Sequence, residues 1–129
     1  MQNAIRTGVD IVELHQIVEE MNRNPDFAYD LLTKDEMKLY QTLEPAAQPG
    51  FLAGRLAAKE AVLKSIGAKK KLRYDDVEIL PGRDGQPVVV YSQPMREILN
   101  RERLHFIEVS IARSKSYAVA NAVAGRDKR

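Results

Sequence analysis

The sequence predicts a mixed fold of helices and strands that is organised around one long helix at residues 51–67. The interior of this segment is mostly Ala, Leu, Lys and Glu, which favour helices. Pro49 precedes it and Gly67 closes it, as is typical of a helix start and a helix end. Segments with alternating apolar residues, which indicate strands, lie before and after it.

The elements before this helix follow from local patterns. Residues 4–12 alternate as a strand, and Gly8 lets another element approach its backbone closely. Helical spacing then recurs in four apolar residues: Leu14, Ile17, Val18 and Met21. A short helix is expected at 27–32, and the capping box Thr33-Lys34-Asp35-Glu36 predicts the start of another. Residues 44–49 are expected to form a loop.

After the central helix the chain reads as a basic loop, a hairpin, a helix and two strands. The loop carries Lys69, Lys70, Lys71 and Arg73. We expect hairpin strands at 77–80 and 87–91, a helix from 92 to about 103, and strands at 106–112 and 117–124. Ala118, Ala120 and Ala122 give the last strand one flat face. That face implies close packing, either on the central helix or on another subunit.

Length and composition predict one domain of a soluble protein. We expect this domain to span residues 1–124 and to be followed by a charged tail at 125–129. The absence of cysteine excludes disulfides and thiolate metal sites, and it fits a reducing cytoplasm. The sequence shows no signal peptide and no apolar run of membrane length, so a cytoplasmic location without membrane contact is expected.

Charge is unevenly distributed along the chain. Residues 1–30 hold two basic and six acidic residues, a balance of −4, whereas the remaining 18 basic and 12 acidic residues give +6. An acidic front and a basic rear suggest that different partners meet different faces. Aromatic residues do not interleave with the basic ones as a stacking platform requires, so no nucleic-acid partner is expected.

Charged residues of the central helix lie in or beside its apolar face. Arg55 and Lys59 fall within the apolar arc, and Glu60 and Lys64 lie together at its edge. These residues either line a polar site or extend to solvent, with Glu60 and Lys64 as a surface ion pair. Asp10 lies near a strand-to-helix junction, where it is either a functional carboxylate or a helix cap.

Three segments of the sequence resemble one known family. They are Gly8–Leu14, residues 51–64 with Phe-Leu-Ala-Gly-Arg and Ala-Ala-Lys-Glu-Ala, and Val109-Ser110-Ile111. The family is the holo-(acyl-carrier-protein) synthases, which are 4′-phosphopantetheinyl transferases, and the resemblance extends from about Gly8 to Val123. It implies the α+β phosphopantetheinyl transferase fold, in which an antiparallel sheet packs on a long central helix, and a homotrimer with active sites between subunits.

The resemblance also implies a reaction and its residues. The 4′-phosphopantetheine arm of coenzyme A moves to a serine of an acyl or peptidyl carrier protein, with Mg²⁺, and adenosine 3′,5′-bisphosphate leaves. Asp10 and Glu60 match the metal carboxylates, and Lys64 matches the lysine that supports the phosphate and the leaving group. The implied catalytic residues are therefore Asp10, Glu60 and Lys64. The residues implied to bind coenzyme A are Arg55, Lys59, Lys64, Gly67, Lys69, Ser110 and Arg113.

The sequence departs from the family at the coenzyme A site. Arg113 stands where the family has histidine, and an arginine stays charged and cannot act as a base. If that histidine orients coenzyme A, activity survives the change; if it carries a proton, activity is lost. Gly67-Ala68-Lys69 replaces a Gly-Thr-Gly segment of the family. Because it has one glycine fewer, its backbone has less freedom to wrap around a phosphate.

A further departure concerns the carrier-facing surface. Family members present arginines to acidic carriers, whereas the matching positions here are Gln16, Arg23, Asp26 and Asp30. Repulsion between two acidic surfaces predicts that the carrier is a specialised, less acidic one. The alternative is a non-catalytic or weakly active relative that binds coenzyme A within a larger assembly.

Overall fold

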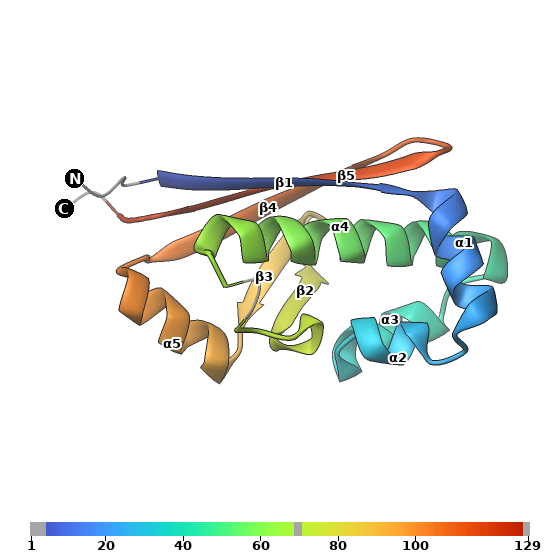
Figure 1. Ribbon diagram of the computed structural model, residues 1–129, viewed down its shortest axis with the longest axis horizontal. Helices are drawn as coiled ribbons and strands as arrows, with labels where there is room; N and C mark the ends of the chain where they lie inside the picture. The colour runs from blue at the N-terminus through green and yellow to red at the C-terminus, as the bar shows by residue number, and fades with distance from the viewer. Residues whose placement is uncertain (1–4, 69–70, 128–129) are drawn as a thin grey trace.

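The long helix α4 (Gln48–Ile66) lies across one face of a three-stranded antiparallel sheet (Figure 1). The computed structural model describes residues 5–68 and 71–127. In sheet order the strands are β1 (Ile5–Glu13), β5 (Tyr117–Gly125) and β4 (Phe106–Arg113). The predicted packing of an antiparallel sheet on the central helix is therefore confirmed.

Small residues allow the sheet and the helix to approach closely. The inward face of β5 consists of four buried alanines: Ala118, Ala120, Ala122 and Ala124. They pack against α4, whose own Ala53, Ala57 and Ala61 are fully buried. Of the two options for the flat alanine face, the central helix is the observed one.

Gly8 is required where β1 crosses α4. A Cβ atom at this position would lie 2.1 Å from the carbonyl oxygen of Ala61 and 2.8 Å from the amide nitrogen of Ser65. Backbone atoms cannot yield as a flexible side chain can, so only glycine allows this approach. The close approach expected from the sequence is thereby confirmed.

The other elements cover the opposite side of α4 (Figure 1). Three short helices follow β1: α1 (Leu14–Arg23), α2 (Phe27–Leu31) and α3 (Lys34–Gln41). The capping box at Thr33 and Glu36 is present at the start of α3. A hairpin of β2 (Val77–Pro81) and β3 (Pro87–Tyr91) precedes α5 (Gln93–Glu102).

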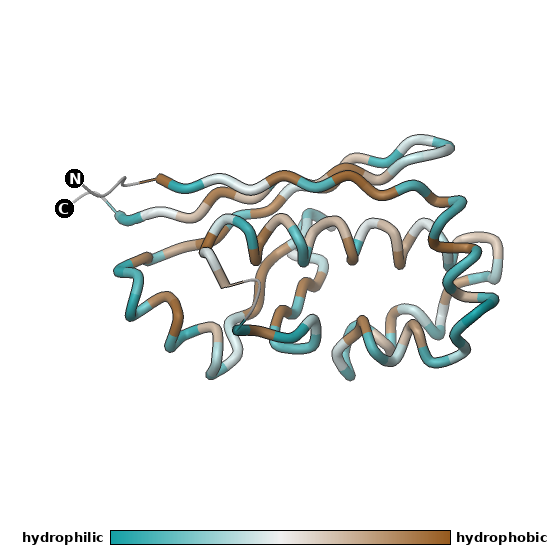
Figure 2. Tube along the Cα trace, in the orientation of Figure 1, coloured by the Kyte–Doolittle hydropathy of each residue, from teal (hydrophilic) through white to brown (hydrophobic). Residues whose placement is uncertain are grey.

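Hydrophobic residues occur along α4 and along the strands of the sheet (Figure 2). Most of them are buried in the core, but some on β1 are exposed. Side chains of β1 alternate between the two faces, and those that point away from α4 are Ile5, Thr7, Val9 and Ile11. Ile5, Val9 and Ile11 are 60%, 60% and 61% exposed. The sheet therefore presents an uncovered apolar surface on the side opposite the helix.

Some predicted boundaries need correction. The helix α4 begins at Gln48, and Pro45–Ala47 forms a 3₁₀ turn, so the expected loop at 44–49 is largely helical. Pro49 lies within the first helical turn, where its missing N–H leaves no hydrogen bond unmade. Gly67 ends the helix in the left-handed region, at φ 68°, as expected.

Hydrogen bonds hold the C-terminal segment as far as Asp127. Gly125 is the last residue of β5 and accepts a hydrogen bond from the amide of His105. Arg126 donates to the carbonyl of Arg103, and the amide of Asp127 donates to His105. The strand β5 therefore continues one residue beyond the predicted end at 124. No helix within 5–68 or 71–127 is long and apolar enough to cross a membrane.

Candidate active site

Asp10, Glu60 and Lys64 come together where β1 crosses the C-terminal half of α4. The Lys64 ammonium donates to the Asp10 carboxylate (Nζ–Oδ1 2.9 Å) and to the Val9 carbonyl (Nζ–O 3.1 Å). Glu60 precedes Lys64 by one turn on the same side of the helix. Because Gly8 brings the strand so near the helix, Asp10 reaches the lysine directly. The structure therefore groups all three predicted catalytic residues.

A tyrosine that sequence reasoning did not single out also belongs to this region. The hydroxyl of Tyr74, in the 3₁₀ turn η2 (Tyr74–Asp76), donates to Glu60 (Oη–Oε1 2.6 Å). Burial, the hydrogen bond to Glu60 and the charges of Glu60 and Asp10 raise the pKa of Tyr74 to about 12. The hydroxyl is therefore a donor at any physiological pH. Tyr74 comes from a loop, where no periodic pattern could have revealed it.

The two carboxylates, Asp10 and Glu60, supply the hard oxygen ligands that Mg²⁺ prefers. Among residues 5–68 and 71–127, no cluster of three or more acidic or histidine residues could hold a metal alone. Mg²⁺ is typically held by one or two carboxylates, and water and substrate phosphates complete its coordination. The donor set fits such a shared site and does not fit a metal cage built by the protein alone.

Lys59 is held inside the protein, which corrects the prediction that it binds coenzyme A. Its side chain is fully buried. The ammonium donates to the Leu31 carbonyl (2.6 Å), to Glu36 Oε1 (2.6 Å) and to the Tyr74 carbonyl (3.0 Å). Burial lowers the pKa of Lys59, and the adjacent Glu36 carboxylate opposes that effect. With three acceptors inside the protein, Lys59 has no proton left for a ligand, and it does not extend to solvent either.

Arg55, in the N-terminal half of α4, and Arg113, at the end of β4, form a second charged region. The side chain of Arg113 lies over two glycines of the helix: a Cβ at Gly50 would be 3.0 Å from its Nη1, and one at Gly54 would be 3.7 Å from its Cδ. Both arginines line a cavity of about 200 Å³ with the hairpin turn, including Gly85. Both arginines are predicted coenzyme A residues, and the structure brings them together.

The surroundings of Arg55 leave positive charge in this cavity, which we call the arginine pocket. The guanidinium stacks on Phe51, with Cζ 4.5 Å from the ring centroid. Its Nε is buried and has no hydrogen-bond partner among the described residues, and it lies 3.7 Å from Glu36 Oε2. Burial lowers the pKa of Arg55, Glu36 counters this, and Arg113 adds to the lowering. Such a pocket favours an anion.

The remaining predicted coenzyme A residues are less well grouped. Ser110 lies on the outer face of β4 beside Asn121, whereas Ile111 and Arg113 face α4. Within one chain, Ser110 therefore points away from both charged regions. Gly67 lies three residues beyond Lys64, at the end of α4. Lys69 lies outside the described residues.

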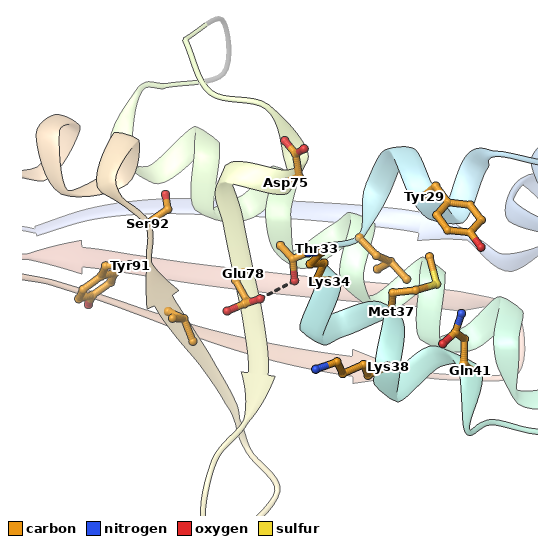
Figure 3. A pocket seen from close by; sticks show the side chains of 12 residues that line it. Tyr29, Thr33, Lys34, Met37, Lys38, Gln41, Asp75, Glu78, Tyr91 and Ser92 are labelled. Atoms are coloured by element: carbon orange, nitrogen blue, oxygen red, sulfur yellow. Dashed lines mark hydrogen bonds between the residues drawn. The ribbon is translucent and has the colours of Figure 1, made fainter.

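A larger cavity, of about 710 Å³, lies away from these residues, between α3 and the hairpin (Figure 3). Lys34 and Lys38 line one wall, and a hydrogen bond from Thr33 to Glu78 (2.5 Å) crosses the middle. None of the predicted site residues lines it. The cavity of greater volume and the predicted site residues therefore lie in different parts of the molecule.

Comparison with known proteins extends over nearly the whole chain. A family model described as the 4′-phosphopantetheinyl transferase superfamily matches residues 6–122. The holo-[acyl-carrier-protein] synthase of Geobacillus sp. (strain WCH70) is 37% identical over 124 residues, which cover 95% of this chain and 97% of that relative.

Solved structures of the same kind are similar in fold. A holo-(acyl-carrier-protein) synthase from Bacillus anthracis str. Ames, in complex with CoA (3′,5′-ADP), is 30% identical with a TM-score of 0.79, covering 95% of this chain and 96% of that one. The holo-ACP-synthase from Plasmodium yoelii gives a TM-score of 0.84 at 26% identity, covering 98% of each chain. The chain therefore belongs to the holo-[acyl-carrier-protein] synthase family of 4′-phosphopantetheinyl transferases.

Proposed function

We propose that this protein transfers the 4′-phosphopantetheine arm of coenzyme A to a serine of a carrier protein in a Mg²⁺-dependent reaction, releasing adenosine 3′,5′-bisphosphate. The observation that carries the proposal is the grouping of Asp10, Glu60 and Lys64 at one crossing of strand and helix. The coenzyme A complex of the B. anthracis relative supports the choice of substrate.

Each residue at the crossing has a definite part in this reaction. Attack of a serine oxygen on the pyrophosphate builds negative charge on oxygens that are already anionic. Lys64, oriented by Asp10 and the Val9 carbonyl, holds a positive charge beside those oxygens. Asp10 and Glu60 would hold Mg²⁺, which supplies further positive charge and lowers the pKa of water when bound. Positioning and electrostatics do most of the catalysis in phosphoryl transfers of this kind.

The arginine pocket suits a different phosphate of the same ligand. Coenzyme A carries a 3′-phosphate besides the pyrophosphate, and we assign that group to Arg55 and Arg113. The adjacent guanidiniums of Arg55 and Arg113 support this assignment, as does the Nε of Arg55, which makes no hydrogen bond to the described residues. Since Arg113 keeps its charge, its part is binding and not proton transfer.

The uncovered apolar face of the sheet suits contact with other copies of the chain. Ile5, Val9 and Ile11 would be covered in a homotrimer with active sites between subunits, the assembly known for the family. Ser110 lies on the same outer face. In such an assembly it would face a neighbouring subunit, where it would contribute to an active site between the two chains. Light scattering after size exclusion tests this: a trimer is expected, and a monomer at micromolar concentration would contradict it.

The acidic front suits a carrier that is less acidic than usual. The basic residue of this surface, Arg23, is paired with Glu20, so it offers little attraction to an acidic partner. A groove of about 480 Å³ along α1, lined by Glu19, Glu20 and Arg23, leads to Tyr74 beside the candidate site. We propose a specialised carrier, encountered in the cytoplasm, whose docking surface tolerates these carboxylates.

A second function is favoured by one observation, the arginine in place of histidine at position 113. In that case the protein binds coenzyme A but transfers little or nothing, and acts within a larger assembly. The ordered grouping of Asp10, Glu60 and Lys64 favours the enzyme over this alternative, because a binding module has no evident need for such a set.

The decisive experiment incubates the protein with coenzyme A, Mg²⁺ and a panel of carrier proteins, and measures intact carrier mass. A phosphopantetheine adduct on one carrier, lost with Asp10→Ala, is the expected result. Coenzyme A binding without an adduct on any carrier would support the alternative. Arg113→His would then test whether the histidine restores transfer.

A further inference from the structure

Tyr74 is the residue near the candidate site to which no part of the reaction has yet been assigned. Its hydroxyl donates to Glu60 at 2.6 Å, a short distance typical of a strong hydrogen bond to a carboxylate. The side chain is half-buried, and it lines both the groove along α1 and a smaller cavity of about 340 Å³ beside Glu60. The tyrosine therefore lies between two openings, and Glu60, which accepts its hydrogen bond, lines the smaller one.

The backbone that carries this tyrosine is held in place. The Tyr74 carbonyl accepts from the buried ammonium of Lys59, which is itself anchored by Glu36. At the other side of the turn, the amide of Arg73 donates to Asp76 Oδ2 at 2.8 Å, and the Asp76 amide donates back to Arg73 at 3.1 Å. One hydrogen bond from the protein interior and two within the turn thus hold the backbone that carries the tyrosine ring.

We propose that Tyr74 is a positioning residue for the transfer: its hydroxyl holds the Glu60 carboxylate in the orientation that a phosphate-bound divalent cation requires. The inference rests on the proposed function, because it assigns Glu60 to the cation. A glutamate at the surface of a helix samples several rotamers, and a donor on a separate, fixed element selects among them. The hydroxyl of Tyr74 acts on the carboxylate and does not touch the reacting atoms.

This connection also gives the buried Lys59 a link to the site. The ion pair of Lys59 with Glu36 supports the turn, the turn carries Tyr74, and Tyr74 orients Glu60. Hydrogen-bonding partners of metal ligands typically change metal affinity or activity by about 10- to 100-fold when they are removed. Loss of the hydroxyl should therefore weaken the cation site measurably without unfolding the protein.

The test is Tyr74→Phe, which keeps the ring and removes only the hydroxyl. Mn²⁺ serves as the probe, and its affinity is measured by electron paramagnetic resonance on the folded protein saturated with coenzyme A, whose phosphates complete the cation site, and without a carrier. We expect Mn²⁺ affinity to fall about 10-fold. In the transfer assay, the Mg²⁺ concentration for half-maximal rate should rise by a similar factor, and the rate should recover at high Mg²⁺. A merely structural hydroxyl would not produce that recovery.

Tyr91→Phe is the matched control. The Tyr91 hydroxyl also makes one hydrogen bond, accepting from the Ile107 amide at 3.0 Å, but it lies against the large cavity beside α3. This variant should lose a comparable amount of thermal stability and keep the Mn²⁺ affinity of the wild type.

The outcomes separate this inference from the proposed function. If Tyr74→Phe binds Mn²⁺ within twofold of the wild type and keeps its Mg²⁺ dependence, the positioning role is refuted while the proposed enzyme stands. If the wild type itself shows no Mn²⁺ binding and no Mg²⁺ dependence, the metal assignment fails, and the inference fails with it.

Discussion

The two charged regions along α4 differ in how their charges are balanced. At the β1 crossing, Lys64 is paired with Asp10, and Glu60 accepts a hydrogen bond from Tyr74. The positive charge of Lys64 therefore lies among negative carboxylates. In the arginine pocket, two guanidiniums lie together, and the Nε of Arg55 has no hydrogen-bond partner among the described residues, although the Glu36 carboxylate lies 3.7 Å from it. The first region suits a cation and a phosphate together, whereas the second suits a bare anion. Two regions with different charge balance therefore lie along one helix, and each suits a different part of a phosphate-bearing ligand.

Removing a carboxylate from the first region should have the largest effect. Asp10→Ala and Glu60→Ala should each reduce Mg²⁺-dependent transfer by more than about 100-fold, because Lys64 loses its partner or the cation loses a ligand. Transfer is measured by carrier mass, and folding by circular dichroism. Glu97→Ala, at an exposed position of α5, is the control and should transfer normally. Unchanged turnover in either site variant would exclude the metal assignment.

Lys59 allows the contrast between buried and exposed charge to be measured directly. Lys59→Met should lower the free energy of unfolding by about 3–5 kcal/mol, since it leaves Glu36 buried without its ammonium partner. Lys64→Met makes the same chemical change five residues later, at a half-exposed ion pair, and should cost about 1 kcal/mol or less. Urea unfolding of both variants provides the comparison, and equal losses would contradict it.

The arginine pocket can be separated from the first region by kinetics. Arg113→Ala should raise the KM for coenzyme A about 10-fold while kcat changes little, because a binding contact is lost away from the reacting phosphorus. With coenzyme A that lacks its 3′-phosphate, the variant and the wild type should perform alike. Arg101→Ala, on the exposed side of α5, serves as the control. A selective fall in kcat would instead assign Arg113 to the chemical step.

The smallest effect is expected at the acidic front. Asp26→Arg combined with Asp30→Arg should raise kcat/KM on a strongly acidic carrier about threefold at low salt, and the gain should vanish at high salt. The control is Asp84→Arg with Glu97→Arg, which makes the same change in net charge elsewhere. An equal gain in the control would mean that these aspartates do not face the carrier.

Features with local causes could be predicted from the sequence. The capping box at Thr33 and the left-handed Gly67 depend on residues a few positions apart, and both are present. The start of α4 was misjudged because a proline is tolerated within the first turn and does not mark its boundary. Alternation along β4 already separated Ser110 from Ile111, so its outward direction could have been inferred.

Contacts between distant segments could not be predicted in the same way. A helical wheel places Lys59 in an apolar arc but says nothing of Glu36, which lies 23 residues earlier and neutralises it. Tyr74 reaches Glu60 from an irregular turn 14 residues later. Both cases depend on packing, and they explain why the sequence assigns Lys59 to coenzyme A and does not reveal the contact of Tyr74 with Glu60.

Gly8 has a genetic consequence. Gly8 has no side chain that could take part in the reaction. Adding one methyl group there would nevertheless force β1 away from α4 and separate Asp10 from Lys64. A random-mutation screen for inactive variants should therefore recover substitutions at residue 8 as often as at the catalytic positions. Such variants would retain every reactive group and fail because those groups no longer meet.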